Sequence, residues 1–218
     1  MKIFTTIRIR WCLRMGLLLI LFGFSSSIFA QENEMALFRE DWKEIPAETP
    51  VTEDHLENEK LNLHLYGAAK QELKKSHHPE IANDPFYIWS GTCDDTWALA
   101  LGHKDLDFDL RDPSSKIVWR SKQSGFRTLR IILELKDGTW LVSEQGSEAT
   151  KDWETSSFML NELSWRKLNL EGIFEGQPVE DPDLSHVVKV GFTDLMRGGG
   201  TPASSRLDWI EVHGVAIE

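Results

Sequence analysis

The stretch TLRIILELKDGTWLVSEQ, residues 128–145, decides the fold. Its two apolar runs are separated by Asp137-Gly138, a dipeptide typical of a tight turn between antiparallel strands. Arg130 and Glu134 interrupt the first run, whose alternate positions are all apolar: Leu129, Ile131, Leu133 and Leu135. Because successive side chains of a strand point to opposite faces, this strand has one face for a core and one that carries charge. The stretch therefore predicts a half-buried β-hairpin.

Short runs of the same kind continue from residue 86 to the end of the chain. They are rich in β-branched and aromatic residues, and clusters of Gly, Pro, Asp and Ser separate them. No long helical pattern lies between them, as a doubly wound α/β fold would require. We therefore predict an all-β fold, an antiparallel two-sheet β-sandwich over residues 86–218. Residues 31–85 are less regular, and we expect an N-terminal extension that packs on the sandwich and contains short helical turns.

The first 30 residues have the pattern of a secretory signal peptide. Cationic residues precede an apolar run at 15–24, and small residues follow up to Ala30. The run is shorter than the roughly 20 apolar residues of a membrane-spanning helix. Cys12 lies before the run, whereas a lipid-accepting cysteine would lie just after it. We expect cleavage near Ala30 and a secreted or periplasmic protein without a membrane anchor.

The charge of the mature chain is strongly negative. The whole sequence has a net charge of −11, and loss of the four cationic residues before the apolar run would leave −15. Nucleic acids and anionic membranes bind basic surfaces, so neither is an expected partner. Cys93 is the only cysteine after residue 30, so no disulfide can form within one mature chain. We interpret Cys93 as a small buried hydrophobic residue rather than a catalytic thiol.

The glycine-rich stretch RGGGTPASS, residues 197–205, invites comparison with a phosphate-binding loop. Such a loop needs a lysine and a hydroxyl residue that open a helix, whereas here no lysine follows the glycines and a strand comes next. The stretch is most simply a connection between the last two antiparallel strands. Loops at the end of a sandwich often carry function, so the rim of a binding site is the alternative.

Two segments near the end of the chain carry a family resemblance. DPDLSHVVKVGF at 181–192 and SSRLDWIEVHG at 204–214 resemble the closing strands of galactose-binding-like jelly rolls. The branch that they resemble most contains carbohydrate-binding modules and complex-I assembly factors. The central segments at 114–135 and 152–170 agree in order, so the resemblance covers roughly residues 86–218. It implies a jelly roll with ligands on the concave face or at the loop end.

Glycan recognition is the function that these features favour. Eight of the nine tryptophans follow residue 30, and flat aromatic rings stack on the C–H faces of sugars while charged groups bind hydroxyls. We assign Trp119 and Trp97 to the core and Trp89 to the surface. With the positions to which the resemblance points, the predicted ligand-binding residues are Trp89, Arg120, Arg130, Asp194 and Arg206. Ordinary cross-strand salt bridges are the alternative interpretation of the charged residues.

Metal binding is a separate hypothesis. The resemblance implies a structural calcium ion between the first and last strands, where four carboxylates are available: Glu40, Asp41, Asp208 and Glu211. Calcium takes six to eight oxygen ligands, so backbone carbonyls would have to complete such a site. His77 and His78 do not predict zinc, because adjacent residues of a strand point to opposite faces and no third ligand is suitably spaced.

Enzyme motifs are missing from the sequence. The E-x-D-x-x-E signature of jelly-roll laminarinases and the G-x-S-x-G nucleophile elbow do not occur. Tyr87 and His103 could serve a polysaccharide lyase as bases, but no motif surrounds them. We therefore expect an exported, non-catalytic protein that binds a polysaccharide or acidic glycan. The alternatives are a secreted polysaccharide lyase or glycoside hydrolase, and a structural or protein-interaction domain.

Overall fold

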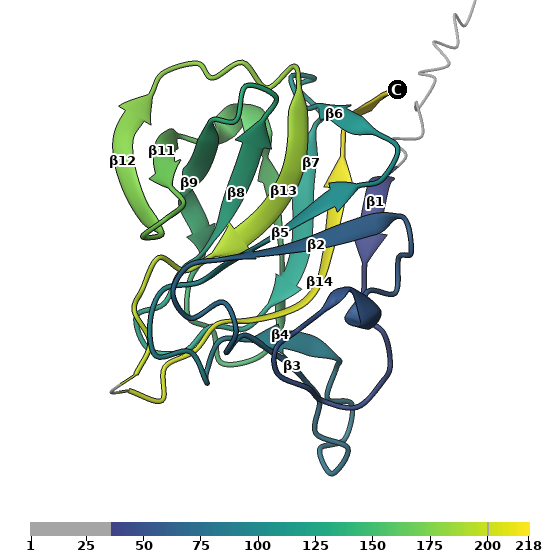
Figure 1. Cartoon of the computed structure of the whole chain (residues 1–218), viewed down its shortest axis with the longest axis vertical. Coiled ribbons are helices and arrows are strands. Elements are labelled where there is room, and N and C mark those ends of the chain that lie inside the picture. The colour runs from purple at the N-terminus through teal and green to yellow at the C-terminus, as the bar shows by residue number, and fades with distance from the viewer. Residues whose placement is uncertain (1–35, 200) are drawn as a thin grey trace, which may run out of the picture. The chain divides into compact units, whose positions relative to one another are not determined.

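The structure is a computed structural model in which residues 36–199 and 201–218 are described. These residues form two antiparallel β-sheets and two short 3-10 helices, η1 (Glu53–His55) and η2 (Leu160–Glu162) (Figure 1). The prediction of an all-β sandwich is confirmed, and its helical turns are 3-10 turns. The predicted signal peptide lies outside the described residues. Within them, no helix has the length and apolar character needed to cross a membrane.

The smaller sheet has six strands. Its path is β10-β7-β14-β4-β3, and β1 also pairs with β14. The last long strand of the chain is therefore central, held by neighbours from both the first and the middle parts of the sequence. The bounds are β1 (Ala36–Glu40), β3 (Lys74–Ser76), β4 (Tyr87–Trp89), β7 (Lys116–Ser121), β10 (Glu154–Met159) and β14 (Arg206–His213).

The larger sheet has nine strands. Its path is β12-β11-β9-β8-β13-β5-β2, and β6 pairs with both β13 and β15. The predicted hairpin at 128–145 is present as β8 and β9, joined by the Asp137-Gly138 turn. The bounds are β2 (Leu61–Tyr66), β5 (Ala98–His103), β6 (Asp107–Asp109), β8 (Leu129–Leu135), β9 (Trp140–Ser147), β11 (Trp165–Asn169), β12 (Phe174–Val179), β13 (Val187–Thr193) and β15 (Val215–Ile217).

The described part of the N-terminal segment, residues 36–85, contributes strands to both sheets. β1 pairs with β14 and β3 pairs with β4 in the smaller sheet, whereas β2 forms an edge of the larger one beside β5. The backbones of these three strands thus have ladder partners on the sandwich.

The main core lies between the two sheets and follows the predicted alternation. Ile117 and Trp119 of β7 are fully buried, as are Ile131 and Leu133 of β8. Trp97 is also buried and meets Phe192 edge to face, with ring centroids 6.0 Å apart. The assignment of Trp97 and Trp119 to the core is therefore correct.

A second apolar cluster lies on the other side of the larger sheet. It contains seven buried residues: Ala98, Ala100, Ile132, Trp140, Val142, Leu168 and Ile173. The connection between β11 and β12 reaches over this side, because the Thr96 hydroxyl donates a hydrogen bond to the Gly172 carbonyl at 3.2 Å. Ile173 in that connection is completely buried. One end of this outer surface is thereby covered, and the β12 edge is fixed relative to β5.

Two glycines of neighbouring strands give a direct test of this packing. A Cβ atom at Gly191 of β13 would lie 2.1 Å from the Leu99 carbonyl oxygen, whereas at Gly102 of β5 the nearest atom would be 3.4 Å away. We expect Gly191→Ala to lower the free energy of unfolding by about 3 kcal/mol, because backbone must move to make room. Gly102→Ala, the matched control, should change it by less than about 0.5 kcal/mol. Urea unfolding measures both, and equal effects would contradict this register of β13 against β5.

Candidate functional site

A buried ion pair joins the two loops that form one candidate site. Nη1 of Arg127, just before β8, lies 2.6 Å from Oδ2 of Asp194, just after β13. Both side chains are almost completely excluded from solvent, at 3% and 0% exposure. The Asp194 carboxylate also accepts hydrogen bonds from the Ser205 hydroxyl and the Met196 amide. Its oxygens are therefore engaged by protein donors, as a buried charge requires.

The same guanidinium organises the glycine-rich connection. Arg127 donates to the carbonyl oxygens of Ala203, Met196 and Arg197 at 2.9, 3.4 and 3.2 Å. A Cβ atom at Gly198 would lie 1.7 Å from the Cys93 carbonyl oxygen, so only glycine allows this close approach. The interpretation of the stretch as a strand connection is correct. The Arg127 side chain holds this connection together through its three hydrogen bonds to backbone carbonyls.

The residues next to this ion pair form a small pocket whose lining is partly apolar and partly polar or charged. We call it the Phe126 pocket; it has a volume of about 260 Å³ and is lined by Phe126, Thr128, Arg130, Phe174, Glu175, Asp194, Leu195 and Met196. Phe126 is 95% exposed, Phe174 55% and Met196 40%. Only two other large hydrophobic residues in the described ranges are exposed to a similar degree. Such clustering of apolar surface on a water-facing pocket is typical of a binding site.

Charged groups stand at one side of the Phe126 pocket. Nη1 of Arg130 in β8 lies 2.7 Å from Oε2 of Glu175 in β12. Nε of Arg166 in β11 lies 3.7 Å from the same oxygen. The carboxylate thus has two guanidinium neighbours, both partly open to water. This arrangement presents hydrogen-bond donors and acceptors beside the exposed rings.

The other predicted ligand-binding residues lie on the opposite sheet. Trp89, Arg120 and Arg206 occupy the outer face of the smaller sheet, with Arg206 paired to Trp89 across β14 and β4. Nη1 of Arg120 lies 2.6 Å from Oδ2 of Asp208, and its guanidinium lies 5.7 Å from the Trp153 ring. We call this surface the small-sheet face. Two sites therefore contain the five predicted residues: Arg130 and Asp194 share the Phe126 pocket, and the other three lie apart from it.

Among the tryptophans of residues 36–199 and 201–218, three are not fully in the core, and all three lie on the small-sheet face: Trp89, Trp153 and Trp209. Each is already contacted by a cation of the chain: Lys74 lies 5.6 Å from the Trp89 ring and Arg39 lies 4.0 Å from the Trp209 ring. These cation–π contacts occupy part of the aromatic surface. A ligand on this face would have to compete with them.

The four carboxylates considered for calcium are each engaged by donors of the protein itself. The Glu40 carboxylate is buried and accepts hydrogen bonds from three backbone amides, which hold it in place. Asp41 and Glu211 both pair with Arg39, and Asp208 pairs with an arginine of β7. In residues 36–199 and 201–218, no group of three or more His, Cys, Asp or Glu side chains is arranged to hold a metal. The calcium site at these four residues therefore stays a prediction that would depend on backbone carbonyl ligands.

Cys93 has the environment that the sequence suggested. It is buried, and its sulfur lies near the Ala69 carbonyl. Burial raises the pKa of the thiol to about 12, with a further contribution from nearby Glu72. Since the thiolate is the reactive form, this cysteine is not a nucleophile at neutral pH.

Phe126 and Phe174 were not predicted from the sequence. The tryptophans are unusually numerous in the sequence, whereas Phe126 and Phe174 each lie alone beside a turn. The local signal was Phe126 in SGFRT, an aromatic residue between a glycine and an arginine where no core position is expected. Nothing in the chain near Phe174 indicated that it would meet Phe126.

Comparison with known proteins finds solved structures whose strands are arranged in a broadly similar way. No family model matches the sequence, and no curated protein matches it. Among solved structures, a family 11 carbohydrate-binding module of a cellulosomal cellulase of Clostridium thermocellum has 16% identity and a TM-score of 0.43, covering 72% of this chain and 88% of that one. A family 29 module in complex with mannohexaose has 10% identity and a TM-score of 0.44, with 81% and 92% covered. TmCBM61 in complex with beta-1,4-galactotriose has 9% identity and a TM-score of 0.36, with 70% and 88% covered.

These similar structures are galactose-binding-like jelly rolls, the group that the sequence resembles. At such identities and TM-scores the likeness carries no information on ligand or site. The position and chemistry of a site have to come from this chain's own residues.

Removing one member of the buried pair tests its structural role. Asp194→Ala would leave the Arg127 guanidinium buried without a counter-charge, so we expect the free energy of unfolding to fall by roughly 3–5 kcal/mol. Asp95→Ala is the matched control, because Asp95 pairs with the exposed Arg197 on the same connection at 2.6 Å. An exposed ion pair contributes little, so the control should unfold almost like wild type. Equal destabilisation of the two variants in urea would show that the buried pair does not organise the loops.

Proposed function

We propose that the chain is exported and binds a polysaccharide or acidic glycan in the Phe126 pocket, without cleaving it. The observation that carries the proposal is the meeting of two exposed aromatic rings with a water-facing Arg–Glu pair in one concavity. The pocket volume of about 260 Å³ is just below the usual range for drug-sized ligands. It suits one sugar unit, with the rest of the glycan lying along the surface.

The apolar side chains of the Phe126 pocket account for its affinity for a sugar ring. A pyranose ring has a flat face of C–H groups, and an aromatic ring that covers this face removes apolar surface of both partners from water. Phe126 and Phe174 have the exposure that such stacking needs, and Met196 adds an adaptable apolar contact. Without a ligand these side chains leave apolar surface in water.

The charged groups account for a preference for acidic over neutral sugars. A guanidinium binds a carboxylate or sulfate through two parallel hydrogen bonds, and Arg130 is positioned to do so at the pocket. If Arg130 turns from Glu175 to an acidic sugar, Arg166 remains as a cationic neighbour of that carboxylate. Glu175 then stays paired while it accepts hydrogen bonds from hydroxyl groups.

The same groups favour binding over catalysis. The two carboxylates of the pocket, Glu175 and Asp194, are each engaged by arginine, which leaves neither free to act as a general acid for glycoside hydrolysis. Burial raises the pKa of Tyr66 to about 12 and also raises the pKa of Tyr87, the only other tyrosine of the chain. A phenolate base of the kind a lyase uses is thus disfavoured at neutral pH.

A glycan array tests the proposal, with Phe126→Ala and Phe174→Ala beside the wild-type protein. Each substitution should weaken binding of the selected glycan about three- to tenfold, because it removes one stacking ring. Ile81→Ala is the matched control, since Ile81 is 52% exposed but lies outside the pocket. Neither phenylalanine supports the core, so thermal unfolding of the variants should match wild type.

Three results would contradict the proposal. If the wild-type protein binds no glycan on the array, a structural or protein-binding role is favoured. Loss of binding in Arg120→Ala, with Phe126→Ala unaffected, would place the ligand on the small-sheet face. New reducing ends, or unsaturated products that absorb ultraviolet light, would show an enzyme.

A further inference from the structure

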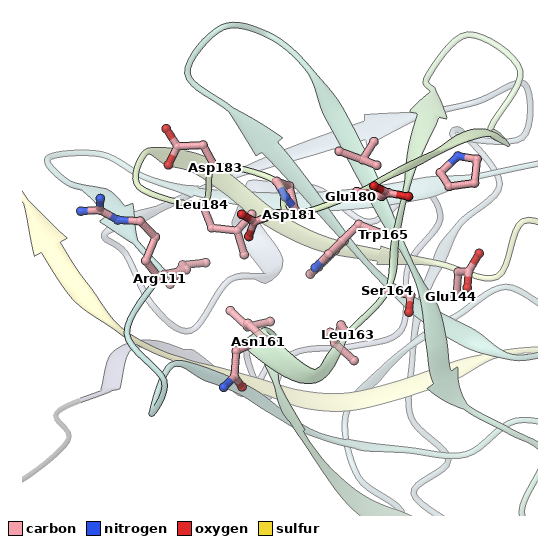
Figure 2. Close-up of a pocket in the computed structure, with 15 residues that line it drawn as sticks. Arg111, Glu144, Asn161, Leu163, Ser164, Trp165, Glu180, Asp181, Asp183 and Leu184 are labelled. Atoms are coloured by element: carbon pink, nitrogen blue, oxygen red, sulfur yellow. The ribbon is translucent and has the colours of Figure 1, made fainter.

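A second and larger cleft lies apart from the Phe126 pocket. It has a volume of about 920 Å³, and its walls come from the connection after β6, from η2 with the start of β11, and from the connection between β12 and β13 (Figure 2). It shares no residue with the Phe126 pocket. We call it the acidic cleft, because four carboxylate side chains line it: Glu144, Glu180, Asp181 and Asp183.

The floor of the acidic cleft is apolar and contains one polar atom that faces inward. Leu110, Leu160 and Leu184 line it and are almost fully buried. Trp165 is only 3% exposed, and Figure 2 shows its indole nitrogen directed into the space between Asp181 and Asn161. Within residues 36–199 and 201–218 this N–H donates no hydrogen bond, and it is open to the cleft rather than sealed inside the core. An indole N–H can only donate, so the cleft offers one donor to an incoming oxygen.

The charges around the cleft are unbalanced. Its one cationic side chain, Arg111, is already paired with Asp109 at 2.6 Å. Glu144 has a weak partner in Arg166 at 3.4 Å. Glu180 and Asp181 have no ion-pair partner in the described part of the chain, and hydrogen bonds from Ser185 lower the pKa of Asp183. The cleft therefore presents unpaired negative charge at its rim.

We infer that the acidic cleft binds a short basic segment of another protein, in extended form. The aliphatic stem of a lysine or arginine lies on the leucine floor, and its cationic head reaches Asp181 or Asp183 at the rim. A backbone carbonyl of the segment accepts the hydrogen bond from Trp165. The Asn161 amide, at the mouth of the cleft, offers a further donor and acceptor for the segment's backbone (Figure 2).

Other occupants fit these observations less well. A metal ion needs converging ligands, and the described carboxylates include no group of three arranged to hold one. An anionic glycan would meet the unpaired carboxylates directly. A glucosamine oligomer carries cations, but the C–H faces of its rings stack best on flat aromatic surfaces, whereas the apolar floor here consists mainly of leucine side chains.

Fluorescence anisotropy with the purified protein tests the inference. The probe is a short labelled peptide in which lysine and leucine alternate, and a glutamate–leucine peptide is its counterpart. The double variant Glu180→Gln/Asp181→Asn should weaken binding of the lysine peptide about tenfold, since it removes two charges from the rim. Trp165→Phe keeps a ring but removes the N–H, and should weaken binding about threefold. Glu80→Gln/Asp152→Asn removes two exposed charges elsewhere and should leave binding within about twofold of wild type.

The outcomes separate clearly. Binding of the lysine peptide that falls with added salt and with both cleft variants supports the inference. Equal binding of the glutamate peptide, equal weakening by the control double variant, or binding of a glucosamine tetramer in place of the peptide would overturn it. If Trp165→Phe unfolds, the double variant alone decides, because its two side chains are exposed. Glycan binding at the Phe126 pocket is unaffected by any of these results.

Discussion

The ion pair between Arg127 and Asp194 is the constraint on which the candidate site depends. A buried charge is tolerated only when its partner and its remaining hydrogen bonds are all in place. Here the guanidinium also holds three carbonyls of the glycine-rich connection, and the carboxylate holds Ser205. One interaction therefore fixes the loop before β8 against the loop after β13. The pair acts as a positioning element and leaves ligand contact to its neighbours.

The order of residues along the chain explains why apolar side chains are exposed beside the buried pair. Phe126 precedes Arg127 directly and Met196 lies two residues after Asp194, so burying the two charges leaves Phe126 and Met196 exposed. Phe174 is the first residue of β12, and the connection between β11 and β12, which covers the second apolar cluster, fixes its position. The rigid scaffold thus holds exposed aromatic rings that make no contribution to the core. Binding residues are often placed in this way, on loops that a rigid scaffold positions.

The sequence predicted the fold better than the site, for physical reasons. Alternation along β7 and β8 identifies the core face because it depends on neighbours within one strand. The Arg127–Asp194 pair joins residues that are 67 positions apart, and no local pattern shows which arginine meets which aspartate. From the sequence, Arg120 and Arg130 belong to one predicted set of ligand-binding residues, although strand pairing puts them on different sheets. The likeness to jelly rolls could indicate layers but not these partners.

Mapping a glycan onto the protein by NMR tests the central claim most directly. The ¹H–¹⁵N spectrum would be recorded during titration with the glycan selected on the array. We expect the amide signals near Phe126, Phe174 and Met196 to shift, while those near Arg120 on the small-sheet face stay in place. Shifts confined to the small-sheet face, with the loops around the Arg127–Asp194 pair unchanged, would contradict the account.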